Sequence, residues 1–398
     1  MTSSDHIDLI ASEPPTPLEG SSIEAWMLAD DMTFLNHGSF GGLPRAVAAA
    51  QREFKDLLES DPYEAIWGTS RDQLLAARSS VAEFVGCTPE NLVTAVNASD
   101  AINSVLRSIR LKPGQSIVAS THGYYAVTQT MRFVADRAGA QLRELPLFPP
   151  LPDEAGILKA FDESIDCDTA LVMVDHVSSP TAMKFPVEQI VEMCRDRNVP
   201  VMVDGAHAPG MIDLDVEAIG ADFYTGNLHK WVSAPTGAAF LHVDPRHHSR
   251  IHPTIISHYL GDGYQEEFHW LGTRDTTAFL AAPSAIKWFD ETFGWSEVRR
   301  HNRQLVSWAA GRLCEEWGVT PLDVPSSSHE CSMRTIRLPE RVREGFDDIE
   351  QWRAWLRREH RIDAAVHDWA GEWWLRLSAH VYNRPEDYVR LAEVGLLF

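Results

Sequence analysis

The chain lacks long hydrophobic runs and the glycine motifs of common nucleotide-binding proteins. Its 398 residues are 44% hydrophobic and 23% charged, as in a folded globular protein. No run of 18 apolar residues could span a bilayer. No G-x-G-x-x-G follows the early strand-like segments and no G-x-x-x-x-G-K-[ST] occurs, which disfavours an NAD-dependent oxidoreductase or a nucleoside-triphosphate enzyme. The first residues carry acids where a signal peptide carries basic residues, so we expect a cytoplasmic protein.

Cysteine and positive charge are also scarce. The five cysteines never form a C-x-x-C pair, which argues against a disulfide framework or a cysteine zinc site. Lys and Arg number 35 against 57 Asp and Glu, a net charge of -22 that repels phosphate backbones and anionic lipids. We therefore expect neither nucleic acid nor a membrane as a partner. The histidines between 247 and 258 lack carboxylates at ligand spacing, so we interpret them as surface residues and expect no metal.

Apolar strand-like segments that end in polar clusters dominate the middle of the chain. They lie at 116–120, 170–174 and 201–203, and helical stretches such as 188–197 alternate with them. This alternation predicts an α/β fold with a mainly parallel central sheet flanked by helices. In such sheets ligands bind at the carboxyl ends of the strands.

The length suits one large and one smaller domain. We predict an N-terminal arm over residues 1–32 that packs on the small domain. The large domain then covers 33–275, with a helix from about residue 72 that ends at Gly86. A smaller α+β domain covers 276–398, with helices over 277–289 and near 295–317 and 349–361.

An acid, a histidine and a lysine are predicted to meet at one edge of the sheet. Asp204 directly follows the apolar run 201–203, and His207 lies three residues further on. A second apolar segment, 221–224, leads into a polar turn over 225–229 and then Lys230. Singly these could be a strand-end acid and a surface lysine, but together they favour a catalytic site.

Two further loops are candidates for ligand contact. Residues 36–44 form a glycine-rich loop where backbone could approach a ligand, or only a tight turn. Ser99 and Asp100 stand at the start of a predicted helix. There they could simply cap the helix, or the free N–H groups and the helix dipole could form a phosphate site.

These motifs, in this order, resemble the isopenicillin N epimerase-like branch of the class V aminotransferases, which are fold type I pyridoxal-phosphate enzymes. The resemblance runs from about residue 32 to the C-terminus. It rests on the segments Asn36–Gly41, Asn97–Ser99, His176–Thr181, Asp204–His207, Asn227–Trp231 and Gly272–Asp275.

The resemblance implies pyridoxal 5'-phosphate as the cofactor and assigns three catalytic residues. Lys230 would bond to the cofactor aldehyde and then move protons at the substrate α-carbon. Asp204 would keep the pyridine nitrogen protonated. His207 would lie near the ring and its phenolic oxygen.

The resemblance also implies how the cofactor is held. Tyr124 would lie over the ring, while Ala98, Ser99 and Asn227 would hold the phosphate. Gly272 and Thr273 would reach the phosphate of the neighbouring subunit, so a homodimer with shared active sites is implied.

Arg376 matches the arginine that binds the substrate carboxylate, a bidentate task suited to guanidinium. It could also pair with a carboxylate for structural reasons. Four more residues are expected to choose the substrate: Asn36, His37, Asp100 and Thr181. Two departures from the family pattern concern the same region, since Ser99 and Asp100 replace a usual pair of threonines and Ala182 stands where glycine is common.

The reaction itself stays open at the level of sequence, because the bond held perpendicular to the cofactor ring decides it. We lean toward β-elimination from a cysteine S-conjugate of a specialised metabolite, a C–S lyase reaction. Epimerisation of an amino acid and decarboxylation-linked deamination or transamination are the alternatives. A scaffold that has lost its cofactor is disfavoured by the presence of both Asp204 and Lys230.

Overall fold

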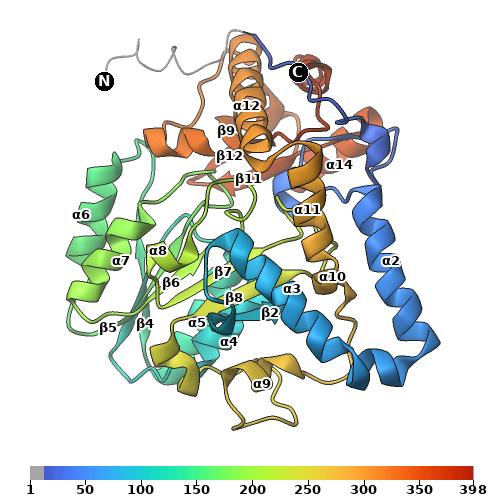
Figure 1. Cartoon of the computed structure of the whole chain (residues 1–398). Coiled ribbons are helices and arrows are strands. Elements are labelled where there is room, and N and C mark those ends of the chain that lie inside the picture. Colours follow the sequence, from blue (N-terminus) through green and yellow to red (C-terminus); the bar gives the residue numbers. More distant parts are fainter. Residues whose placement is uncertain (1–12, 398) are drawn as a thin grey trace.

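The computed structural model describes residues 13–397 and is built around a seven-stranded sheet (Figure 1). Within the described residues, β8 is the one antiparallel member of this sheet and the other strands run parallel, as predicted. In spatial order the strands are β2 (Leu92–Ala95), β8 (Ala239–Val243), β7 (Phe223–Asn227), β6 (Val201–Asp204), β5 (Thr169–Asp175), β3 (Ser116–Ser120) and β4 (Gln141–Leu145).

Helices cover both faces of the sheet, and alternate residues of each strand face opposite cores. In β5, Val172 and Val174 belong to one core, whereas Leu171 and Met173 belong to the other. The first core also contains residues of α3 (Ser70–Val85), α6 (Glu154–Ser164), α7 (Val187–Asp196) and α8 (Val216–Ile219). The second contains residues of α4 (Ala98–Ser108), α5 (Tyr125–Ala138) and α9 (Tyr264–His269).

The C-terminal part forms a separate antiparallel sheet with its own core. The strand order is β11 (Ala365–Trp369), β12 (Glu372–Ser378) and β9 (Met333–Arg337). Its core draws on α12 (Trp295–Trp317), α14 (Ile349–His360) and α15 (Pro385–Gly395), with α13 (Glu340–Glu344) beside them. The short β1 (Thr33–Phe34) pairs in parallel with β10 (Ile362–Asp363), which ties the start of the chain to this part.

Residues 13–32, the described part of the predicted arm, contact the C-terminal segment. The Arg384 guanidinium donates to the Ser21 hydroxyl at 3.1 Å, and the rings of Trp26 and Tyr382 lie 4.7 Å apart. Residues 1–12 lie outside the described residues, and the domain boundaries at 32 and 275 stay predictions. No helix in the described part of the chain combines the length and apolar character needed to cross a membrane.

Several predicted elements have the observed bounds, and two do not. The helix α12 spans Trp295–Trp317 as expected, and α3 ends at Gly86, whose φ is 69°. The turn predicted at 225–229 is wrong in its first half, since Thr225 to Asn227 continue β7 and pair with β8. The helix predicted over 277–289 is two helices, α10 (Thr277–Leu280) and α11 (Ala282–Thr292), with Pro283 in the first turn of α11.

The remaining helices are α1 (His37–Phe40) and α2 (Arg45–Ser60), which connect the arm to α3.

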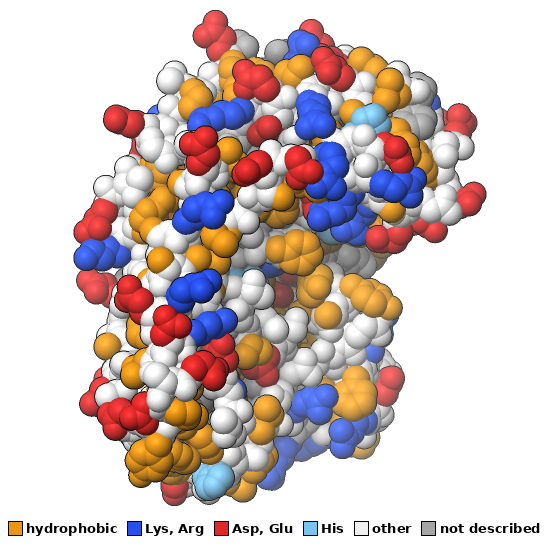
Figure 2. Space-filling model, turned by 90° about the vertical axis from the view of Figure 1, so that its right-hand side faces the viewer, with side chains coloured by type: hydrophobic (Ala, Val, Ile, Leu, Met, Phe, Trp, Pro, Cys, Tyr) orange, Lys and Arg blue, Asp and Glu red, His pale blue; other side chains and the backbone are white. Residues whose placement is uncertain are grey.

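Figure 2 shows a face on which acidic and basic side chains are interspersed, with hydrophobic side chains between them.

Candidate active site

Two buried carboxyl groups end adjacent strands at the carboxyl edge of the main sheet. Asp204 closes β6 and Asp175 closes β5, and the two are paired in register. In-register residues of adjacent parallel strands point to the same face, so the carboxyl groups are neighbours. Burial raises the pKa of Asp204, and burial together with the charge of Asp204 raises the pKa of Asp175 well above its usual range. One oxygen of Asp204 accepts the Ala206 N–H at 2.9 Å, and the other has no hydrogen-bond partner among the described residues.

Lys230 follows β7 and carries the amine of the site. Burial, together with the positive charge of Arg376, lowers the pKa of Lys230 to about 7, against a smaller opposing effect of Asp204. An ordinary lysine amine titrates near 10.4, so Lys230 is a neutral nucleophile for an unusual share of the time at neutral pH.

His207 lies beside this amine in a defined hydrogen-bond arrangement. Trp231 Nε1 donates to His207 Nδ1 at 3.3 Å, and Lys230 Nζ is 3.2 Å from His207 Nε2. Because indole N–H can only donate, Nδ1 is the acceptor and neutral His207 carries its proton on Nε2, facing Lys230. Burial, followed by the charge of Lys230, lowers the pKa of His207 well below its usual range, which keeps the ring neutral.

The start of α4 offers unused donors beside the end of β7. Asn97 caps the helix by accepting the Asp100 N–H, and the Ala98 N–H donates to the Asn227 side-chain oxygen, both at 2.9 Å. The amide and hydroxyl of Ser99 and the side-chain N–H groups of Asn227 have no partner among the described residues. Free N–H groups at the start of a helix of this length bind anions, so the geometry suits a phosphate.

Arg376, in β12, reaches the site from the C-terminal sheet and is 1% exposed. Its Nη1 donates to the backbone oxygen of Ser179 at 2.7 Å, and its Nη2 donates to the Ser39 hydroxyl at 2.8 Å. Its Nε is buried without a hydrogen-bond partner. Burial lowers the pKa of Arg376 to about 10, so the guanidinium stays charged at neutral pH. A buried cation with a free donor suits an incoming carboxylate.

Asn36 and His37 support the site residues. Asn36 accepts the Ser39 hydroxyl at 2.5 Å, and Ser39 in turn contacts Arg376. His37 Nε2 donates to the Lys230 carbonyl at 3.0 Å, and its Nδ1 lies 2.9 Å from the Tyr382 hydroxyl. The side chains of Asn36 and His37 thus orient the arginine and the lysine loop.

Glycines allow the 36–44 loop to lie directly against the site. Gly41 has a φ of 76°, and a side-chain carbon there would come within 2.1 Å of the His229 carbonyl oxygen. A side-chain carbon at Gly38 would lie 3.4 Å from the Arg376 Nη2 and 2.8 Å from the Met333 sulfur. The glycines of this loop therefore allow close approach to protein backbone and side chains, and an approach to a ligand stays a prediction.

Thr181, Asp100 and Tyr124 are further substrate and cofactor candidates, and each has different surroundings. The Thr181 hydroxyl is buried between His122 Nδ1 at 2.7 Å and the Ser178 hydroxyl at 2.6 Å. Asp100 points to the Thr254 hydroxyl, which donates to it at 2.9 Å. Tyr124 precedes α5 at the carboxyl edge of the sheet and is 48% exposed.

Gly272 and Thr273 lie in a loop after α9, and no hydrogen bond joins them to the site within the described residues. Ala182 stands where glycine is common in the family, and its φ is 54°. Glycine adopts a positive φ more easily than alanine, which explains why glycine suits this position.

Four residues of the site were missed by sequence reasoning. Asp175 could have been found from its place at the end of a predicted strand beside that of Asp204. Ser39 and Ser179 lie inside two of the segments that carry the resemblance, but their contact with Arg376 joins distant parts of the chain and has no local pattern. His229, in the Asn227–Trp231 segment, donates through Nδ1 to the Ala238 carbonyl at 3.0 Å and leaves its Nε2 free.

Together these residues place a neutral amine, a buried acid and a neutral histidine between an anion site and an arginine. The described residues contain no group of three or more His, Cys, Asp or Glu side chains that could hold a metal ion. The arrangement therefore suits covalent capture of a carbonyl compound that carries a phosphate, with proton transfer by the amine.

The comparisons with known proteins agree with this geometry. The family model described as aminotransferase class-V matches residues 44–341. The chain is 34% identical over 376 residues to isopenicillin N epimerase of Streptomyces clavuligerus, covering 90% of this chain and 93% of that protein. It is 31% identical over 397 residues to putative L-cysteine desulfhydrase 1 of Oryza sativa subsp. japonica, covering 90% and 81%. A cysteine desulfurase structure from Thermococcus onnurineus NA1 superposes with a TM-score of 0.78 at 20% identity, covering 96% and 98%.

Proposed function

The chain belongs to the class V aminotransferase family, and on that premise we propose that it cleaves the carbon–sulfur bond of a cysteine S-conjugate. It is a pyridoxal-phosphate-dependent enzyme of fold type I. The similarity to a putative L-cysteine desulfhydrase supports the choice of reaction. The observation that carries the proposal is the low-pKa amine of Lys230, 3.2 Å from the neutral His207 and within the electrostatic influence of Arg376.

The residues present fit pyridoxal phosphate. The unpaired oxygen of Asp204 suits the protonated pyridine nitrogen, and the unused donors of Ser99 and Asn227 suit the phosphate. Lys230 supplies the amine for the aldehyde, and Tyr124 the aromatic face for the ring. His207 would contact the phenolic oxygen through the Nε2 proton that its tautomer provides. When bound, this cofactor withdraws electrons from the α-carbon of the amino acid joined to it.

The proposed reaction needs few protein groups. The free Nε of Arg376 binds the substrate carboxylate and fixes the orientation of the α-carbon, and Lys230 removes the α-proton. The electron pair then expels the thiolate as the Cβ–S bond breaks, and the thiolate takes up a proton. With one water, a cysteine S-conjugate gives a thiol, pyruvate and ammonia.

We further propose a larger S-cysteinyl metabolite as the substrate, in a homodimer that shares its active sites. Exposed apolar side chains support an interface beside the 272–273 loop. The ring of Trp67 lies 4.5 Å from that of Trp270 at a tilt of 34°, and Ile255, Ile256 and Leu260 are exposed in the segment before α9. Five free cysteines support a reducing, cytoplasmic compartment.

A two-part experiment tests the assignment. The purified protein is expected to be yellow, and borohydride should bleach it and leave the cofactor on Lys230, as detected by peptide mass. A colourless protein that stays colourless with added pyridoxal phosphate would rule out the enzyme proposal. Cysteine S-conjugates are then incubated in deuterated water, where pyruvate formation supports β-elimination.

Epimerisation is the second candidate, since the Streptomyces relative at 34% identity is an epimerase. Deuterium exchange at the α-carbon without pyruvate would favour it, and carbon dioxide release would favour the decarboxylation-linked reaction.

The dimer proposal is tested by subunit complementation. A Lys230→Ala variant and a Thr273→Trp variant are each expected to be inactive. If the sites are shared, exchange of subunits between the two should restore activity, because each mixed dimer contains one site with both changes and one with neither. A monomer in light scattering would contradict the proposal.

A further inference from the structure

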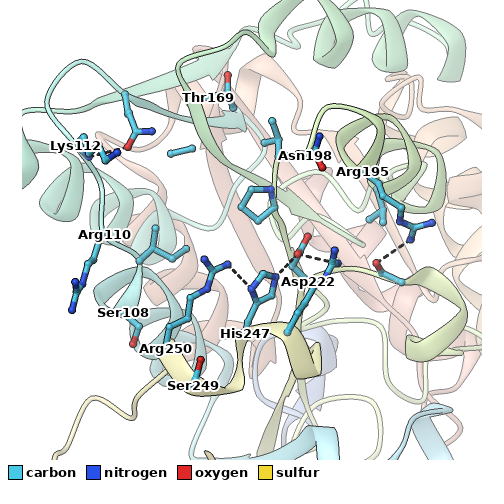
Figure 3. A pocket seen from close by; sticks show the side chains of 18 of the residues that line it. Ser108, Arg110, Lys112, Thr169, Arg195, Asn198, Asp222, His247, Ser249 and Arg250 are labelled. Carbon is cyan, nitrogen blue, oxygen red and sulfur yellow. Dashed lines mark hydrogen bonds and ion pairs between the residues drawn. The ribbon is translucent and has the colours of Figure 1, made fainter.

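Figure 3 shows a pocket of about 690 Å³. It lies at the edge of the main sheet opposite to the candidate active site. Thr169, Pro200 and Asp222 line it, and these residues stand at the amino ends of β5, β6 and β7. The site residues Asp175, Asp204 and Asn227 close the same three strands at their other ends. The pocket is therefore separate from the candidate active site.

The charge of the pocket is opposite to that of the whole chain. Its lining contains one carboxylate, Asp222, and five cationic side chains: Arg110, Lys112, Arg195, Arg246 and Arg250. The chain as a whole has a net charge of -22. Arg246 pairs with two carboxylates, Asp222 and Asp244, so the other four cations supply the local positive field that attracts anions to this concave surface.

The single carboxylate of the pocket is already compensated. Asp222 accepts hydrogen bonds from His247 Nε2 and from the Val201 N–H, and forms an ion pair with Arg246 at 3.1 Å. His247, predicted as a surface residue, is instead 8% exposed. Arg250 donates to His247 Nδ1, so Arg250, His247 and Asp222 form one continuous hydrogen-bond network (Figure 3). Arg250 has further donors left for a ligand.

Two of the cations have no partner of their own. Arg110 and Lys112 lie on one side of the pocket and Arg195 on the other (Figure 3). No side-chain hydrogen bond or ion pair of Arg110 or Lys112 occurs within the described residues. Arg195 uses one nitrogen on the Gly220 carbonyl at 3.2 Å.

We propose that this pocket binds a small anion with two or more negative charges, such as a phosphate ester or a di- or tricarboxylate. The concave shape favours a small molecule, and the net charge of the chain opposes a nucleic acid. The proposal does not depend on which bond the enzyme breaks, or on the cofactor.

The test uses the holoenzyme, in which the cofactor phosphate fills its own site. Inorganic pyrophosphate is titrated by calorimetry at a fixed ionic strength set with sodium chloride. We expect one binding event per chain, with no change in the cofactor absorbance. The double variant Arg110→Gln/Lys112→Gln should weaken binding by at least about tenfold, since two charge contacts at about 0.7 kcal/mol each amount to that factor.

A matched control removes the same charge elsewhere. Lys287 and Arg358 are exposed cations of α11 and α14 that pair with Glu291 and Glu359, close by in sequence, so Lys287→Gln/Arg358→Gln should bind pyrophosphate as the parent does. Absence of any binding event overturns the proposal, as does an equal loss in the control variant. Release of the cofactor by pyrophosphate would place the binding in the active site and also overturn it. Tighter binding of poly-glutamate than of pyrophosphate would identify an acidic protein segment instead of a small anion.

Discussion

Asp175 and Asp204 are register partners at the ends of two adjacent parallel strands, and both carboxyl groups are buried. Two carboxylates so placed cannot both ionise freely, so a proton is retained by the pair over a wide pH range. If Asp204 pairs with the pyridine nitrogen as proposed, it keeps its charge, and the retained proton then belongs to Asp175. Asp175 is thus expected to stay protonated and uncharged beside Asp204.

Replacement of Asp175 by asparagine should therefore stabilise the protein at neutral pH. A carboxyl group whose pKa is raised on folding contributes stability below its unfolded pKa, about 3.9, and this stability is lost as the pH rises through the folded value. Asparagine has no such proton to lose, so the free energy of unfolding of Asp175→Asn should depend less on pH above about 4.

The measurement is urea unfolding of the cofactor-free protein at several pH values. Asp213→Asn serves as the control, because its side chain is 97% exposed. A variant whose stability falls with pH as steeply as that of the parent would contradict the assignment.

Lys230 should react with aldehydes in a pH range where other lysines do not. Its pKa of about 7 means that the neutral amine, which is the reactive form, accumulates as the pH rises through 7. The rate at which pyridoxal phosphate is incorporated, followed by absorbance, should level off above about pH 8.

Lys230→Arg should give no borohydride-stable cofactor at any pH. Lys287, whose side chain is 72% exposed, is the internal comparison in peptide mapping. Equal labelling of the two lysines at pH 7 would show that the Lys230 amine is not activated.

Substitutions of Arg376 and Ser39 test how the substrate carboxylate is bound. Arg376→Lys should lower kcat/KM for an amino-acid substrate by about 100-fold, or about 2.7 kcal/mol, because an ammonium group cannot replace the planar fork. Ser39→Ala removes one hydrogen bond that orients the guanidinium, and we expect a smaller loss of about tenfold.

A decarboxylated substrate analogue provides the control, since its binding should not depend on Arg376. If the analogue loses as much affinity as the amino acid in Arg376→Lys, the arginine is structural and the carboxylate binds elsewhere.

The parts of the site that could be predicted from sequence are those carried by short segments. Asp204, His207 and Lys230 lie within one stretch, and a parallel strand that ends in an acid fixes where that acid lies. The contacts of Arg376 with Ser39 and Ser179 join residues 337 and 197 positions apart, and no local pattern encodes such pairing. Asn36 and His37 bind the Ser39 hydroxyl and the Lys230 carbonyl, and their contact with a substrate stays a prediction.

Local propensity also failed where tertiary pairing decides the structure. Thr225, Gly226 and Asn227 have the composition of a turn, yet they continue β7 because β8 pairs with them on one side. The histidine segment was misread for the same reason. His247 is buried beside Asp222, which lies 25 positions earlier in the chain, directly before β7. The carboxylate of Asp222 accepts a hydrogen bond from His247 Nε2.

Alanine in place of Gly41 tests the close contact between the 36–44 loop and the Lys230 backbone, because the effect of this contact can be separated from backbone strain. Its φ is 76°, and a side-chain carbon would lie 2.1 Å from the His229 oxygen and 2.7 Å from the Lys230 oxygen. Gly294 has nearly the same backbone conformation, with a φ of 75° and a ψ of 129° against 76° and 147° at Gly41, and no atom lies within 4 Å of its side-chain position. Both alanine variants carry similar strain, about 2 kcal/mol, so Gly294→Ala should lose about that much stability.

Gly41→Ala must also displace the backbone on which Lys230 stands, and we expect a loss of more than about 3 kcal/mol in urea unfolding together with slower cofactor incorporation. Equal losses in the two variants would mean that the 36–44 loop can move away from Lys230 without cost, and that its glycines serve only its own turn.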